Sequence, residues 1–152
     1  MSEYSSIPDT KKHIAVVYEN ISKVLVCLMG RAKKHDQTKM KPGEVEYFDE
    51  YTPKLAGCTY GSEEYKRFLE ELKPALDHHY ANNRHHPEHF ENGISGMNLI
   101  DLIEMFCDWY AATKRHNDGD ILKSIEINQI RFGYSNELRA IFENTYKDIF
   151  QS

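Results

Sequence analysis

The chain has few cysteines and little positive charge for its length of 152 residues. Its three cysteines are scattered and form no CxxC pair, so they predict buried, reduced thiols of an intracellular protein. Nineteen basic residues against 24 acidic ones give a net charge of −5, and there is no long basic run. This balance argues against strong nucleic-acid binding. It remains compatible with an anionic small molecule, because a bound metal can supply positive charge locally.

Long apolar runs are also missing. The longest strongly apolar run, Val24 to Met29, is far shorter than the ~20 residues that span a bilayer. The first residues of the chain have neither the charged segment nor the apolar segment of a signal peptide. The sequence therefore predicts a cytoplasmic protein with no membrane partner.

β-Alternation persists nowhere, whereas apolar residues recur at steps of three and four. The pattern predicts an all-α fold, a compact single-domain helical bundle over residues 1–152, with a core over 10–115 and C-terminal helices over 120–150. A chain of this length can bury one sizeable core. The predicted helices run from Thr10 to Lys34, Glu44 to Tyr51, Ser62 to Ala81, Leu99 to Lys114, Ile121 to Ile130 and Ser135 to Phe150.

Two of these helices begin at capping residues. Ser62 precedes Glu63 and Glu64, whose charges suit the positive end of a helix dipole. Asn98 is followed three positions later by Asp101, which is a variant of the capping box. The first helix has two interpretations: it is one long helix, or two helices joined near residues 20–22.

Five of the eight histidines fall within residues 78–89. Histidine is the commonest metal ligand, so the cluster predicts a metal site at a helix end and in the loop that follows. Residues 85–89 match the H-x-x-E-H pattern of inverted zincins, but that motif needs a helix. Pro87 disfavours a continuous helix there, which argues against a zinc protease. The candidates that stay open are His78, His79, His85 and His86.

The predicted helix over residues 99–114 is apolar nearly all round and should be buried. Asp101, Glu104 and Asp108 lie at steps of three and four, on one face of it. Buried carboxylates need cations, hydrogen bonds or a metal, because a lone buried charge is costly. These acids therefore cap the helix and pair with basic residues, or they bind or orient a metal. The nearby histidines favour the metal.

His35 and Asp36 place a nitrogen and an oxygen ligand side by side at the end of the first predicted helix. Alone, the dipeptide is common and indicates little. Beside other ligands it can contribute two groups to one metal. Lys39 follows three positions later and can hold a phosphate oxygen as a point charge.

Together these motifs resemble the helical HD-domain metal-dependent phosphohydrolases, which use a first His, a His-Asp doublet and a distant Asp in that order. Residues 35–39 look like their HD-x-[small]-K element. Residues 85–93 and 107–113 resemble segments of the HD-GYP branch, which adds histidines and a second metal, although the Gly-Tyr-Pro tripeptide is absent here. The chain is also similar to a small family of uncharacterised phage and bacterial proteins with an N-x-HHPEH core.

The resemblance implies a phosphoric ester hydrolase that acts on a nucleotide or related phosphate ester through a metal-activated water. Nitrogen and oxygen ligands without thiolate suit one or two divalent ions of Mn, Fe, Ni, Zn or Mg. Lys39 and Arg84 are expected to bind the phosphate. Asp36, Lys39 and Glu104 form the expected catalytic group, with Glu104 orienting a ligand. The expected metal ligands are His13, His35, Asp36, His79, His85, His86 and Asp108.

His13 is the candidate for the first histidine of the resemblance. It lies 22 residues before His35. An uninterrupted helix would separate the two by about 33 Å, too far to share a metal. His13 therefore joins the site only if the chain reverses near residues 20–22.

Two other functions fit parts of the sequence. An all-α nucleotide pyrophosphohydrolase would hold Mg with carboxylates such as Glu63, Glu64, Asp101 and Glu104, but it leaves the histidines unexplained. A non-catalytic regulatory protein would keep the metal site for stability or for holding a nucleotide. The last two predicted helices can complete the core or form a homodimer face, and the core is favoured.

Overall fold

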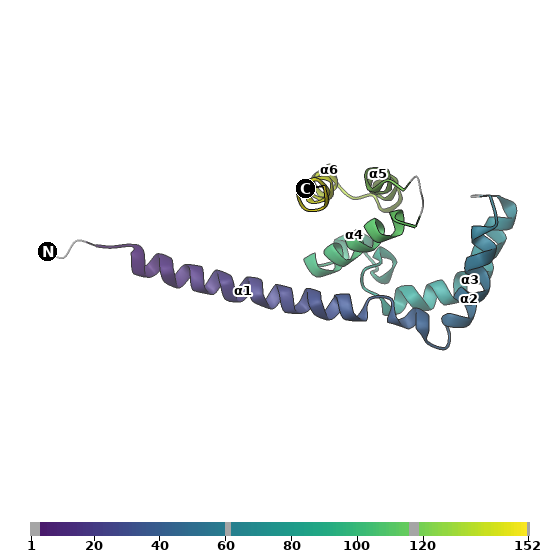
Figure 1. Cartoon of the computed structure of the whole chain (residues 1–152), viewed down its shortest axis with the longest axis horizontal. Coiled ribbons are helices and arrows are strands. Elements are labelled where there is room, and N and C mark those ends of the chain that lie inside the picture. The colour runs from purple at the N-terminus through teal and green to yellow at the C-terminus, as the bar shows by residue number, and fades with distance from the viewer. Residues whose placement is uncertain (1–3, 60–61, 116–118, 152) are drawn as a thin grey trace. The chain divides into compact units, whose positions relative to one another are not determined.

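A computed structural model describes residues 4–59, 62–115 and 119–151 (Figure 1). These residues form helices and connecting loops and contain no β-strand, so the predicted all-α fold is confirmed. The chain divides into two units, Met1–His35 and Asp36–Ser152. The boundary between the two units lies within residues 10–115, which the sequence predicts as the core.

The first unit is a single helix, α1, which runs without interruption over Ile7–Lys34. Ser6 is its N-cap residue, and Pro8 lies in the first turn, where a missing N–H costs nothing. Arg31, Lys33 and Lys34 stand in the last turn, where positive charge suits the helix dipole. Of the two interpretations of this segment, one long helix is confirmed.

One helical segment among the described residues, Ile7–Met40, is long and apolar enough to cross a membrane by length and composition. The mean hydropathy of its most apolar window is 1.3. Core helices of soluble proteins and signal sequences meet the same criterion, so it does not place the chain in a membrane. The cytoplasmic location stays a prediction.

The second unit contains five α-helices among its described residues, with short 3-10 turns and one π-helical turn between or after them. The 3-10 turns lie at Gln37–Met40, Pro87–His89 and Gly93–Gly96. The π-helical turn covers Tyr146–Phe150 and continues the last helix. The helices are α2 (Val45–Ala56), α3 (Glu63–Asn82), α4 (Leu99–Thr113), α5 (Ile121–Phe132) and α6 (Asn136–Thr145).

The predicted caps of α3 and α4 are confirmed. The Ser62 hydroxyl accepts a hydrogen bond from the Tyr65 N–H at 3.1 Å. Asn98 and Asp101 form a reciprocal capping box, each side chain accepting the other's backbone N–H at 3.0 Å. The predicted end of α2 at Tyr51 is wrong, because the helix continues through Pro53 to Ala56.

The core of the second unit lies between α4, α5 and α6. Met105 and Phe106 of α4, Ile125 of α5 and Phe142 of α6 are buried against one another, and the Phe106 and Phe142 rings stack with centroids 5.6 Å apart. Aromatic pairs of this kind add to the burial of apolar area. The core therefore fixes α4, which carries the acidic residues of the site described below.

The cysteines of the described residues are free thiols, as the sequence predicts. Their predicted burial is wrong for two of the three, because Cys27 and Cys107 are exposed. Cys27 lies on α1, which has no buried residue. Cys107 follows the buried Met105 and Phe106, but each further residue turns about 100° around a helix and so leaves the core face.

Candidate metal centre

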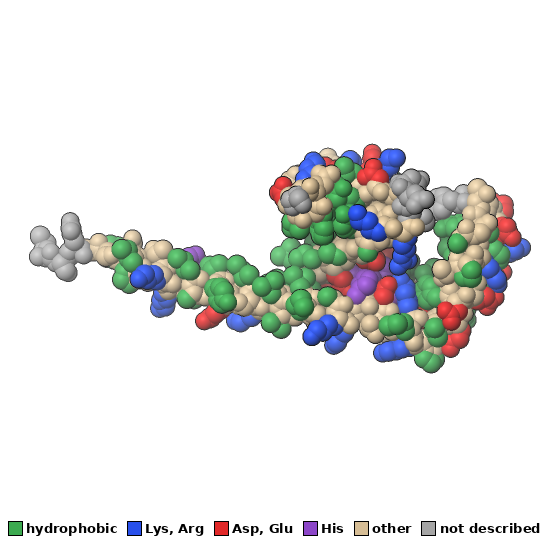
Figure 2. Space-filling view, in the orientation of Figure 1, with side chains coloured by type: hydrophobic (Ala, Val, Ile, Leu, Met, Phe, Trp, Pro, Cys, Tyr) green, Lys and Arg blue, Asp and Glu red, His purple; other side chains and the backbone are tan. Residues whose placement is uncertain are grey.

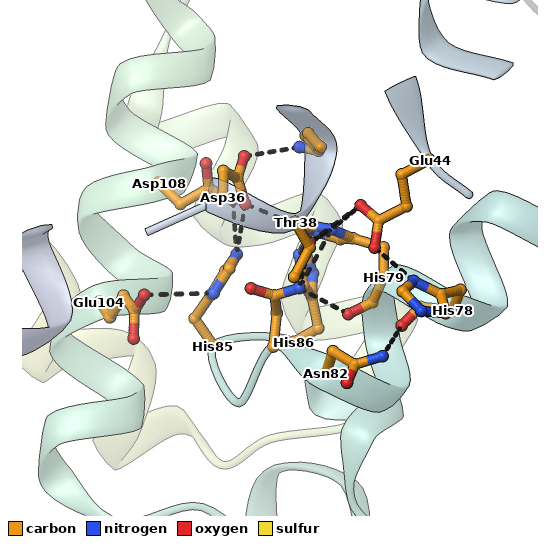
Figure 3. A network of polar contacts seen from close by, with 12 residues as sticks. Asp36, Thr38, Glu44, His78, His79, Asn82, His85, His86, Glu104 and Asp108 are labelled. Carbon is orange, nitrogen blue, oxygen red and sulfur yellow. Dashed lines mark hydrogen bonds and ion pairs between the residues drawn. The ribbon is translucent and has the colours of Figure 1, made fainter. Parts of the chain in front are cut away.

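Four side chains of the second unit converge on one point (Figure 3). They are Asp36, at the start of this unit, His79 near the end of α3, and His85 and His86 in the loop after α3. Each offers a ligand atom, and these atoms all lie within 4.8 Å of one another. The arrangement combines three imidazole nitrogens with one carboxylate oxygen.

The distances show which atoms face the centre. The His79 Nε2 atom lies 3.2 Å from Asp36 Oδ1 and 3.1 Å from His86 Nε2. The His85 Nε2 atom lies 3.4 Å from the same Asp36 oxygen. The Nε2 atoms of all three histidines therefore lie on the inner side of the cluster.

Two glutamates hold the outer nitrogens of two of these histidines. Glu44 Oε2 lies 2.9 Å from His79 Nδ1, and Glu104 Oε1 lies 3.3 Å from His85 Nδ1. An ionised carboxylate only accepts hydrogen bonds, so each Nδ1 must carry the proton. Each Nε2 also lies beside the Asp36 carboxylate, to which it donates when it carries a proton. A bound ion would replace that proton and meet the nitrogen lone pair, as in the carboxylate–histidine pairs that support metal sites.

Glu44 is fully buried, in the loop before α2. Burial raises the pKa of its carboxyl, but hydrogen bonds from His78, His79 and Thr38 outweigh this and hold the pKa below its usual value. The Thr38 hydroxyl donates to Glu44 at 2.9 Å, and His78 Nδ1 lies 2.7 Å from its other oxygen. Glu44 therefore stays ionised and able to orient His79.

The backbone of Asp36 has a φ of 55°, in the left-handed region that few residues other than glycine adopt. Aspartate tolerates this region better than most residues. Burial raises the pKa of its carboxyl, but hydrogen bonds from His79, His85 and Lys39 hold the pKa far below its usual value. Lys39 Nζ contacts Asp36 Oδ2 at 2.6 Å, so the carboxylate is ionised and fixed in orientation.

His86 lies partly buried beside the other two imidazoles. Burial lowers its pKa to about 3, and the neighbouring His85 and His79 act in the same direction. A neutral imidazole is the form that binds metals. His86 is therefore in its ligand form at neutral pH.

The three acidic residues of the face predicted on α4 have different partners. Glu104 and Asp108 lie beside His85, with Asp108 Oδ2 3.9 Å from His85 Nε2. Asp101 is fully buried one turn earlier and caps α4. Arg84 forms two hydrogen bonds to it, at 2.9 and 3.1 Å.

Arg84 also stacks on the Phe90 ring, with its guanidinium carbon 4.8 Å from the ring centroid. The sequence predicts a phosphate contact for this residue. The structure gives its guanidinium the buried Asp101 as a partner, and its contact with a phosphate stays a prediction.

His13 is excluded from the site, which corrects the prediction for this residue. It lies on the uninterrupted helix α1, 22 residues before His35. At about 1.5 Å per residue the two are about 33 Å apart, so His13 and the His35-Asp36 doublet of one chain cannot bind the same ion. His35 itself is the C-cap residue of α1, directly before Asp36, and its role as a ligand stays a prediction.

Two histidines of the 78–89 cluster do not belong to the group of four. His78 is about half exposed and its Nδ1 contacts Glu44. His89 Nδ1 lies 2.9 Å from the Tyr80 carbonyl oxygen and donates to it. Of the four candidates that the sequence leaves open, the structure brings together His79, His85 and His86.

The donor set fits a divalent transition metal. Imidazole suits Zn, Cu, Fe and Ni, and a carboxylate beside it suits the same ions and Mn. The contacts of Glu44 and Glu104 with the outer nitrogens fix the orientation of two imidazoles before any ion binds, which lowers the cost of ordering the site. Figure 2 shows a small histidine surface with acidic and basic side chains around it. Within the group, the Asp36 side chain is 21% exposed, so the group is not sealed from solvent.

Comparison with known proteins identifies one family. A family model described as "Family of unknown function (DUF5662)" matches residues 2–151, and the chain therefore belongs to this family. No curated protein and no solved structure matches the chain.

Proposed function

We propose that this member of the DUF5662 family is a metal-dependent phosphohydrolase that acts on a nucleotide or a related phosphate ester. One observation carries the proposal: Asp36, His79, His85 and His86 converge with their ligand atoms within 4.8 Å of one another. The resemblance of residues 35–39 and 85–93 to HD-domain phosphohydrolases supports the same reaction class.

In this proposal the four converging residues bind the metal, and Asp108 completes the site from α4. His35 is a further candidate ligand because it directly precedes Asp36. A divalent ion bound there would lower the pKa of a coordinated water and polarise a phosphoryl oxygen.

The chain's own residues supply orientation and charge. Glu44 and Glu104 hold the imidazoles of His79 and His85 in the tautomer that binds a metal. Lys39 is about one-third exposed while it contacts Asp36, so its ammonium group can also meet a phosphate oxygen from solvent. Positive charge at this point stabilises negative charge that develops on the phosphate.

Nothing in the described residues favours a Mg-dependent pyrophosphohydrolase built on carboxylates. Glu63 is exposed and pairs with Lys66 on the same helix. The Asp101 carboxylate accepts hydrogen bonds from Arg84 and from the Asn98 N–H at the start of α4. A non-catalytic metal-binding protein remains the contrasting outcome of the experiment below.

The proposal is tested by metal analysis followed by an activity screen. Purified protein is reconstituted with Mn²⁺, Fe²⁺, Ni²⁺ or Zn²⁺, the bound metal is quantified, and phosphate release is measured across a panel of nucleotides. We expect stoichiometric metal and turnover of at least one nucleotide. Asp36→Ala and His86→Ala should lose both metal and turnover.

His13→Ala is the matched control, because it removes a histidine that α1 holds far from the doublet. It should keep wild-type metal content and turnover. Absence of stoichiometric metal would overturn the metal site and the enzyme together. Stoichiometric metal without turnover of any phosphate ester would favour the regulatory protein, and Mg²⁺-dependent turnover that survives Asp36→Ala and His86→Ala but not Glu104→Ala would favour the pyrophosphohydrolase.

A further inference from the structure

Helix α1 carries a seven-residue apolar repeat that the proposed function does not use. Ile7, Ile14, Ile21 and Leu28 recur every seven positions. Val17 and Val24 stand three positions after two of them, and Thr10 takes the corresponding place near the start. These are the a and d positions of a heptad pattern, and we call this set the heptad stripe.

A repeat of seven residues has a definite geometric meaning. It advances 3.5 residues per turn, so a helix that keeps it over several heptads presents one continuous seam and supercoils around a partner. Tyr18 and Leu25 lie beside the stripe and widen the apolar face. β-Branched Ile and Val at a and d pack well into the holes of an adjacent helix.

The stripe is not buried within the first unit. No residue of α1 is buried, and Ile14, Ile21 and Val24 are 60%, 55% and 45% exposed. Figure 2 shows apolar side chains along this helix. Exposed contiguous apolar faces of this kind mark interaction sites.

The area of the face matches a stable protein interface. An Ile, Val or Leu side chain removes on the order of 100 Å² of apolar surface from water when it is buried. The six apolar residues of the stripe, with Tyr18 and Leu25 beside it, therefore offer about 800 Å² per helix, which is what one partner contributes to an interface of standard size. The helix is also about 42 Å long, so the seam has room for several layers of side chains.

The charges of α1 argue against a membrane as the partner. Glu19 and Lys23 lie near the middle of the helix, on the side opposite the stripe. Charged residues at the centre of a bilayer are costly and are rare in spanning helices. At a spacing of four residues they instead suit the solvent-exposed face of a paired helix.

We propose that α1 pairs with α1 of a second copy of this chain through the heptad stripe. The spacing of the apolar residues stays constant along the stripe, so an identical helix offers a matching hole for each projecting side chain. This contact is self-complementary, as symmetric homo-oligomers require. The inference does not depend on the proposed enzymatic activity.

The test uses the full chain and compares two double variants by sedimentation velocity. Ile14→Glu with Ile21→Glu places charge in the centre of the stripe. Val16→Glu with Val26→Glu places the same charge on the same helix but away from the stripe, where both valines are exposed. Circular dichroism checks that each variant keeps its helix content.

We expect the wild-type chain and the Val16/Val26 variant to sediment as a dimer or higher oligomer of the 17.8 kDa chain. The Ile14/Ile21 variant should fall to the mass of one chain with its metal content unchanged. A monomeric wild-type protein would overturn the inference. So would equal loss of association in both variants, or recovery of the wild-type protein only with membranes.

Discussion

The carboxylates of Glu44 and Glu104 fix the orientation of two imidazole rings in the candidate metal centre. Each contacts the Nδ1 atom of a histidine whose Nε2 atom faces the centre. Glu44 is the more deeply buried of the two, and three side chains donate to it or contact it. Its effect on metal binding can be measured separately from that of the ligands.

Glu44→Gln should lower the affinity for a divalent transition metal by about 10- to 100-fold, as loss of such supporting carboxylates typically does. The reason is that Gln keeps the size of the side chain but removes the charge that fixes the His79 tautomer. Competition with a chromogenic chelator measures the affinity. Glu46→Gln, two residues later and exposed, should leave it unchanged, and equal losses in both variants would contradict this role.

The lowered pKa of His86 predicts how the metal-free protein responds to acid. The ordinary pKa of histidine is 6.5, and the pKa of His86 in the folded protein is about 3. At pH values between the two, residue 86 binds a proton in the unfolded chain but not in the folded protein. Stability should therefore fall as the pH drops through this window and be fully present above it. The loss of stability between about pH 6.5 and 5 reflects protonation of histidine, because carboxylates titrate mostly at lower pH.

Urea unfolding at a series of pH values, in EDTA, measures this dependence. In His86→Gln the slope of stability against pH between 6.5 and 5 should be smaller than in the wild type. His13→Gln, on the exposed helix α1, should keep the wild-type slope. An unchanged slope in His86→Gln would show that His86 does not cause the acid sensitivity.

Among the helices, α4 depends on a buried charge at its start. Asp101 caps the helix and is fully buried, and Arg84 supplies its positive partner. Removing the arginine leaves the buried carboxylate without its positive partner, which costs more than the loss of a surface ion pair.

Arg84→Met should lower the free energy of unfolding by about 1–3 kcal/mol, measured by urea denaturation. Arg131→Met is the matched control, because Arg131 pairs with Glu88 at the surface and such pairs contribute about 0–1 kcal/mol. Metal affinity should remain in both variants. If the two substitutions cost the same, the buried pair does not support α4.

For the whole molecule, metal binding should couple to folding of the second unit. The four converging residues come from the start of this unit, from α3 and from the loop after it, and Asp108 comes from α4. An ion that binds only the folded unit stabilises it by about 2.7 kcal/mol at a concentration 100 times the Kd.

Thermal unfolding with and without the metal checks this coupling. The wild-type protein should melt at a higher temperature after reconstitution and return to the lower value when EDTA is added. The Asp36→Ala variant should melt at the lower temperature both with and without the metal. A melting temperature that rises equally in Asp36→Ala would place the stabilising ion elsewhere.

The helices and the caps of α3 and α4 could be read from the sequence, because the interactions that determine them are local, whereas the end of α2 could not. Ser62 and the Asn98–Asp101 pair each act within three residues, so their spacing is visible in the chain. The run of histidines within residues 78–89 is visible in the chain in the same way. The uninterrupted course of α1 was one of two interpretations, since no proline or glycine in its middle decides between them.

The selection among the candidate ligands was decided only by tertiary structure. Glu44 lies 35 positions before His79, and nothing in its neighbourhood indicates that it is buried beside an imidazole. The sequence predicts a phosphate contact for Arg84 and an acidic face for Asp101, yet the packing of the loop against α4 joins the two side chains. The sequence by itself determined the helices, their caps and the supply of nitrogen and oxygen ligands, because these follow from residue type and short spacing. Only the tertiary structure decided that His79, His85 and His86, and not His78 or His89, meet Asp36, because that depends on contacts between segments far apart in the chain.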